Sequence, residues 1–192
     1  MAYIFWHRPY REASQSAYES ALVEFHQHLV EASPPGFQAS EAHRISPTPW
    51  LGERDGYEDW YFVEAAWSLD PLNLAAVSGR VEASHDAVAK LMETGSGGLY
   101  DLVWGEPLPS ARSRVAWLTR PRGIEYAPVL AEVRERSPGR LTCWRRRMVL
   151  GPAPEFALVV PASLDPTVPP GWHVLVIERV SLWPAQEAGR AL

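Results

Sequence analysis

The sequence predicts an α+β protein in which one β-α-β-β-α-β unit occurs twice. Two short echoes support this interpretation: Ser68-Leu-Asp-Pro71 returns as Ser163-Leu-Asp-Pro166, and Arg8-Pro9 returns as Arg120-Pro121. Each motif follows a short apolar stretch, as expected at equivalent strand ends. Self-similarity at a long period is typical of duplication. A chance match is the alternative, because Ser-Leu-Asp-Pro is also an ordinary helix entry.

The first unit is predicted from its hydrophobic periodicity. A helix over 10–32 carries apolar residues at three- and four-residue spacing and stops at Ser33-Pro-Pro-Gly36. A second helical region over 70–94 is broken near Gly79, and Gly95-Ser-Gly-Gly98 is interpreted as its cap and turn. The predicted strands are 2–7, 37–45, 60–67 and 99–104.

The second unit repeats the order in shortened form. Its predicted elements are strands 114–119, 140–150, 155–161 and 172–180 and a helix over 123–136. The segment between Asp165 and Gly171 is short and rich in proline, so this unit is predicted to lack most of its second helix. The chain therefore divides into a first repeat (1–104), a linker (105–113) and a degenerate second repeat with a C-terminal tail (114–192).

Composition narrows the class of protein. With 192 residues and 46% hydrophobic content, the chain can bury an ordinary core. A net charge of −5 argues against a general nucleic-acid binder, which needs a basic face. We expect no membrane span and no signal peptide, hence a cytoplasmic protein, and the lone Cys143 agrees with a reducing compartment. Only Lys90 among 18 basic residues is lysine, which indicates a GC-rich bacterial genome.

The β-α-β-β-α-β order is that of the ferredoxin-like unit. Two such units, over about residues 2–183, resemble the dimeric α/β-barrel superfamily, here fused in tandem so that one chain forms an intrachain α/β barrel. That superfamily includes cofactor-independent monooxygenases, muconolactone-isomerase-like enzymes, haem-binding chlorite-dismutase-like proteins and stress-responsive proteins. The resemblance implies a pocket between sheet and helices or inside the barrel.

Strand parity predicts a site in the first unit. Alternation places Tyr3, Phe5 and His7 on one face, and it does the same for two further sets, Glu41 with His43, and Trp60 with Phe62 and Glu64. We expect these faces to turn away from the helices. There an imidazole and carboxylates would lie among aromatic rings, which raise a carboxylate pKa by desolvation.

The matching positions in the second unit carry opposite charge. Aligning Phe37 with Leu141 places Arg145 and Arg147 at the positions of Glu41 and His43, so opposite charges are expected to meet across the two units. The alternative is salt bridges that close the barrel, or strand ends exposed to water.

No metal or cofactor is expected. His26 and His28 are two apart on a helix and point in different directions, and no zinc spacing, nucleophile elbow or dinucleotide fingerprint is present. Haem is the cofactor that the resemblance leaves open, with His173 as the histidine of the second unit.

Three functions stay open, so the sequence does not decide whether the chain is an enzyme. The first is a cofactor-independent enzyme, monooxygenase-like or isomerase-like, on a small aromatic or apolar substrate, with His7 or Glu64 as base. The second is a non-catalytic binder of an apolar or planar molecule such as haem, and the third is a structural barrel with no pocket. Nine tryptophans suit either a core or an aromatic-lined cavity. We expect a monomer or homodimer, because fused units cover their own sheets.

Overall fold

The computed structural model describes residues 1–106, 113–123, 125–136, 141–147, 153–161, 168 and 170–183. Its helices are α1 (Gln15–Ala32), α2 (Leu69–Ala76), α3 (Gly79–Leu91) and α4 (Tyr126–Arg136), with a short 3-10 turn, η1 (Ala66–Ser68), ahead of α2. Its strands are β1 (Ala2–Pro9), β2 (Phe37–Ile45), β3 (Gly56–Val63), β4 (Met92–Trp104), β5 (Ser113–Thr119), β6 (Thr142–Arg146), β7 (Phe156–Pro161), β8 (His173–Ile177) and β9 (Arg179–Trp183). The fold is α+β, as predicted. None of the described helices is long and apolar enough to cross a bilayer.

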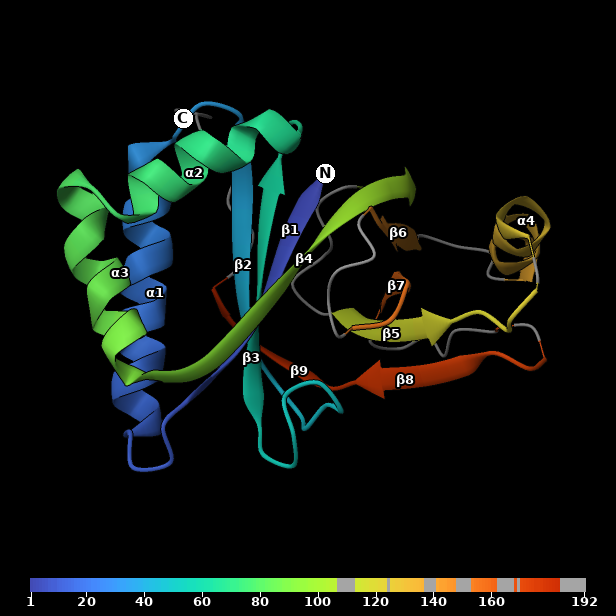
Figure 1. Ribbon diagram of the computed structural model, residues 1–192, viewed down its shortest axis with the longest axis horizontal. Helices are drawn as coiled ribbons and strands as arrows, with labels where there is room; N and C mark the ends of the chain where they lie inside the picture. Colours follow the sequence, from blue (N-terminus) through green and yellow to red (C-terminus); the bar gives the residue numbers. More distant parts are fainter. Residues whose placement is uncertain are drawn as a thin grey trace.

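The strands form one antiparallel sheet in the order β8-β5-β7-β6-β4-β1-β3-β2-β9 (Figure 1). The long strand β4 pairs with β1 through Met92–Tyr100 and with β6 through its last residues. In the second half, two strands make the equivalent contacts: β8 pairs with β5 of its own half, and β9 pairs with β2 of the first half. Only Glu178 separates β8 from β9, so the two ends of the strand order are joined along the chain.

Aromatic side chains fill the inner face of this curved sheet. Five tryptophans from both halves of the chain pack there: Trp6, Trp50, Trp60, Trp117 and Trp144. Ring centroids are 5.3 Å apart for Trp6 and Trp117 and 5.8 Å apart for Trp60 and Trp144. Indoles bury large apolar areas, so these rings act as core here.

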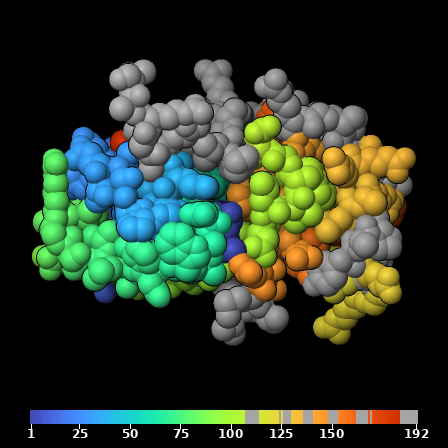
Figure 2. Space-filling model, turned by 90° about the horizontal axis from the view of Figure 1, so that it is seen from above, coloured from blue at the N-terminus to red at the C-terminus, as the bar shows by residue number. Residues whose placement is uncertain are grey.

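Three helices cover the outer face of the first half. Helix α1 begins after Ser14, whose side chain accepts a hydrogen bond from the Ala17 amide, and its face with Tyr18, Leu22 and Leu29 is buried. Helices α1, α2 and α3 lie together at one end of the molecule, and β6, β7 and α4 lie towards the other (Figures 1 and 2). A second core joins these three helices to the sheet.

Two predicted boundaries in the first half are wrong. Strand β3 covers Gly56–Val63 instead of 60–67, and Gly95-Ser-Gly-Gly98 lies inside β4 instead of forming a turn. The glycines are there because the rings of β1 need the space. A Cβ on Gly97 would lie 2.6 Å from Tyr3 ring atoms, and one on Gly95 would lie 3.0 Å from a Phe5 ring carbon.

Other predicted bounds agree in part. The second helical region divides as expected, because α2 ends at Ala76 and α3 begins at Gly79. Helix α1 begins at Gln15 instead of residue 10, and the predicted strand over 172–180 is divided into β8 and β9. The predicted loss of a helix in the second unit falls on residues 166–170, of which 166, 167 and 169 lie outside the described residues, as do Ser163-Leu-Asp-Pro166 and most of the linker.

Candidate functional site

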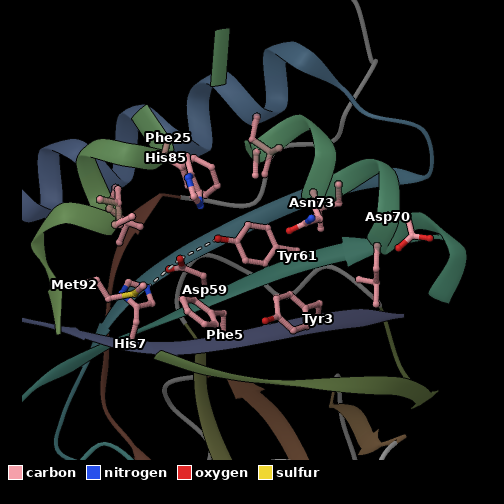
Figure 3. Close-up of a pocket in the computed structure, with 17 residues that line it drawn as sticks. Tyr3, Phe5, His7, Phe25, Asp59, Tyr61, Asp70, Asn73, His85 and Met92 are labelled. Atoms are coloured by element: carbon pink, nitrogen blue, oxygen red, sulfur yellow. Dashed lines mark hydrogen bonds and ion pairs between the residues drawn. The ribbon is translucent and has the colours of Figure 1, made fainter. Parts of the chain in front are cut away.

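A cavity of about 480 Å³ lies between the outer face of β1 and β3 and the helices α1, α2 and α3 (Figure 3). This volume is in the range of pockets that hold small molecules. Most of its wall is apolar. The lining residues are Tyr3, Phe5, His7, Leu22, Phe25, Leu29, Asp59, Tyr61, Leu69, Asp70, Leu72, Asn73, Ala76, His85, Val88, Ala89 and Met92.

A buried carboxylate with two imidazoles lies at one side of this cavity. Asp59 Oδ2 is 3.0 Å from His7 Nε2 and 3.4 Å from His26 Nε2. The Tyr61 hydroxyl donates to the same oxygen at 3.1 Å. Side chains of paired strands share a face, and the register opposes Phe5 to Asp59 and Tyr3 to Tyr61, so β1 and β3 bring these groups together. His26 reaches them from α1.

Each imidazole has a hydroxyl at its other nitrogen. The Tyr18 hydroxyl oxygen lies 2.5 Å from His7 Nδ1, and Ser40 Oγ lies 2.9 Å from His26 Nδ1. All four of these side chains are almost completely buried. Asp59 is therefore the centre of a continuous polar network. One arm runs through His7 to Tyr18, and the other runs through His26 to Ser40.

The surroundings fix the charge of this network. Burial alone would raise the Asp59 pKa, but His7 and His26 hold it well below its usual range. Burial, together with the nearby Asp59 charge, raises the pKa of Tyr18 and that of Tyr61. At neutral pH the network therefore contains an ionised carboxylate beside two protonated phenols.

One oxygen of this carboxylate has no partner. Asp59 Oδ1 is buried and receives no hydrogen bond from the described residues. The Nε2 atoms of His7 and His26 lie close to Oδ2 but outside hydrogen-bonding geometry. Buried polar atoms are usually hydrogen-bonded. Asp59 therefore keeps an acceptor beside the cavity that it lines.

The structure separates the residues that parity had grouped. Tyr3, Phe5 and His7 line the helix-side cavity, whereas Trp60 and Phe62 belong to the inner core. The prediction that all of them turn away from the helices is wrong for β1. The partner of Phe5 across β1 and β3 is Asp59, so the residues that share its face are Asp59 and Tyr61.

The two predicted bases, His7 and Glu64, do not lie in the same cavity. Glu64 lies one residue beyond β3, is exposed and does not line the cavity. Extending the strand to 67 led to the expectation that it was buried, but β3 ends at Val63.

The two predicted arginines lie away from Glu41 and His43. Their strand, β6, pairs with β4 instead of β2. Arg145 is opposite Asp101 in the register, and Arg147 Nη1 lies 3.6 Å from the same carboxylate.

Opposite charges do meet across the two halves, through other residues. Glu58 Oε1 lies 3.3 Å from Arg179 Nη1, and the carboxylate accepts the indole N–H groups of Trp6 and Trp60 at 2.8 and 2.7 Å. Nearby, Glu41 Oε2 lies 3.0 Å from His43 Nε2. Burial and Arg179 lower the pKa of His43.

Asp59, Tyr61 and His26 are site residues that the sequence interpretation missed. A signal for His26 was available, because it follows Leu22 by four residues on the buried face of α1. Predicting Asp59 and Tyr61 as site residues would have required the true start of β3 and its register with β1. Within the described residues, no group of three or more His, Cys, Asp or Glu could hold a metal ion.

Comparison with known proteins finds similar solved structures but no sequence relative. No family model matches the chain, and no curated protein matches it. A candidate monooxygenase from Lactobacillus acidophilus NCFM matches with a TM-score of 0.49 and 11% identity, over 97% of this chain and 98% of its own. A candidate chlorite dismutase matches with a TM-score of 0.49 and 11% identity, over 85% of this chain and 80% of its own. At this level of likeness, neither structure bears on the chemistry of the cavity.

Proposed function

We propose that this protein binds a small, mainly apolar molecule in the cavity between the first-half sheet and its helices. The observation that carries the proposal is an apolar cavity of about 480 Å³ with a buried carboxylate in its wall. Ligand pockets typically combine such apolar walls with a few polar groups that orient the ligand. On the inner face of the sheet, the described tryptophans pack against one another as core.

We infer further that the chain is a duplicated ferredoxin-like protein of the dimeric α/β-barrel kind. The order β4-β1-β3-β2 in the first half has the same form as β8-β5-β7-β6 in the second. Each half extends its last strand to the other, β4 to β6 and β9 to β2. This arrangement supports an internal pseudo-dimer that closes its own barrel, with a monomer or homodimer as its assembly.

Haem does not fit this cavity. Its two propionates need basic partners, but the described lining contains Asp59 and Asp70 and neither lysine nor arginine. Both ring nitrogens of His7 already lie against Asp59 and Tyr18. His173, the histidine considered for the second unit, is exposed on β8.

A cavity-filling variant tests the binding proposal. Ala76 lines the cavity and the adjacent Val77 does not, so Ala76→Phe should occupy the space and Val77→Phe should leave it open. We expect benzylamine and benzyl alcohol to raise the melting temperature of the wild type and of Val77→Phe, because a ligand stabilises the state that binds it. Ala76→Phe should respond weakly. An equal response from all three proteins, or none from the wild type, would contradict the proposal.

A catalytic role is the second candidate, favoured by the polar chain from Asp59 through His7 to Tyr18. Such a chain can move a proton to and from a bound molecule without a cofactor. A weak carbon acid such as phenylacetone in D₂O provides the test, read by NMR. Wild-type protein should accelerate deuterium exchange at the acidic carbon, and His7→Gln should lose that acceleration. Exchange no faster than in buffer would leave binding as the function.

A further inference from the structure

The chemical class of the ligand follows from the charges around the cavity. This inference rests on the proposed binding function. Of the described lining residues, Asp59 and Asp70 carry carboxylates and none is lysine or arginine. Two basic side chains of the first half, Arg8 and Arg54, pair with Glu93 instead, at 3.0 and 2.5 Å. An anion would therefore enter against two carboxylates, whereas a cation would be attracted.

The described partners of Asp59 all lie at one oxygen, Oδ2. Tyr18 keeps its proton, so its hydroxyl can donate to His7 Nδ1, and His7 Nε2 lies 3.0 Å from Asp59 Oδ2. Ser40 can donate to His26 Nδ1 in the same way. The Tyr61 hydroxyl is a neutral donor. Among the described residues, Asp59 Oδ1 is therefore the unpartnered acceptor of this buried network.

Aromatic ring faces lie beside this acceptor. Tyr3 and Phe5 stack at a centroid distance of 6.3 Å, and Tyr3 and Tyr61 stack at 6.0 Å. All three rings line the cavity (Figure 3). The negative face of an aromatic ring attracts a cation, most strongly where water is excluded.

We propose that the cavity selects a protonated amine carried on a small aromatic or apolar body. The ammonium group donates a hydrogen bond to Asp59 Oδ1, and the body packs against Tyr3, Phe5 and the leucines of α1. Burying an ammonium is unfavourable unless an opposite charge and hydrogen bonds compensate. This wall of the cavity provides both.

Four probes of similar size separate charge from shape: benzylamine, benzyl alcohol, toluene and benzoate, titrated calorimetrically into the full chain at neutral pH. We expect benzylamine to bind at least about tenfold more tightly than benzyl alcohol, since a charge-assisted hydrogen bond is the stronger one. Toluene should follow, and benzoate should show no binding. Benzyl alcohol or benzoate binding as tightly as benzylamine would overturn the amine assignment and leave the binding function standing. Failure of all four probes would overturn the binding function itself.

Two variants locate the effect. Asp59→Asn keeps the side-chain volume and removes the charge, so the advantage of benzylamine over benzyl alcohol should fall to less than about threefold. Glu64→Gln removes an exposed charge that does not line the cavity, where solvent screens it, and should preserve the order of the four probes. A benzylamine advantage that survives in Asp59→Asn would overturn the assignment. The order in which the wild-type protein binds the four probes tests the amine assignment even if Asp59→Asn does not fold.

Discussion

At the scale of single residues, the molecule places ionisable groups in two separate interiors. Asp59, His7 and His26 lie on the helix side of the sheet, and Glu58, Glu41 and His43 lie on its inner side. Neighbours in sequence such as Glu58 and Asp59 therefore belong to different networks. Alternation along β3 produces this separation.

His43 should make folding stability depend on pH. Its pKa is lowered in the folded state by burial and by Arg179, so below its ordinary value of about 6.5 the unfolded chain binds the proton first. The free energy of unfolding should therefore fall as the pH decreases through about 6.5, by at most about 1.4 kcal/mol per pH unit from this group.

Urea unfolding at several pH values between neutral and mildly acidic measures this slope. His43→Gln should flatten it, because the variant has no imidazole to protonate. His85→Gln serves as the control, since His85 is about one-third exposed and lies on α3, outside the group of charges that surrounds His43. An unchanged slope in His43→Gln would mean that other groups set the pH dependence.

At the scale of elements, the contact between β1 and β4 shapes the cavity. The rings of Tyr3 and Phe5 lie over Gly97 and Gly95 and so leave room below α2 and α3. In the sequence, the glycines looked like the end of a helix. Their spacing of two residues suits a strand that receives aromatic rings from its neighbour, and this was the overlooked signal.

Gly97→Ala should therefore reduce both stability and ligand response. The added Cβ would overlap the Tyr3 ring, which must move from its place in the cavity wall. We expect a loss of about 1–3 kcal/mol in urea unfolding, typical of overpacking, and a smaller melting-temperature shift with benzylamine. Ser96→Ala, next to it on β4, should behave like the wild type. If Gly97→Ala matched that control, the close contact would have no role in shaping the cavity.

At the scale of the whole molecule, a buried ion pair connects the two halves. Glu58 of β3 and Arg179 of β9 are almost completely inaccessible to solvent. Glu58→Gln should lose about 3–5 kcal/mol in urea unfolding, because it removes one charge of a buried ion pair. The double variant Glu58→Gln with Arg179→Met should recover part of that loss, since it removes both charges of the pair. Additive losses in the two single variants would show that the pair is not coupled.

The sequence predicted the fold better than the site, for a physical reason. Periodicity and turn residues are local, so the order of strands and helices was recovered through most of the described chain. The site depends on which strand faces which and in what register. A shift of four residues in the start of β3 concealed Asp59, and the pairing of β6 with β4 moved Arg145 away from Glu41. The apolar face of α1 indicated that His26 is buried, but it did not indicate that Asp59 is its partner.

Strands β8 and β9 connect the last part of the chain to the first, and this has a consequence for folding during synthesis. During synthesis the first half emerges with Trp6, Trp60 and Phe62 on a bare sheet face, and their partners Trp117 and Trp144 are translated later. The final strand, β9, then returns to β2, which was among the first strands to leave the ribosome. Until Arg179 is synthesised, Glu58 lacks this cationic partner. The nascent chain therefore passes through a stage with an exposed apolar surface, in which a chaperone would protect it from aggregation.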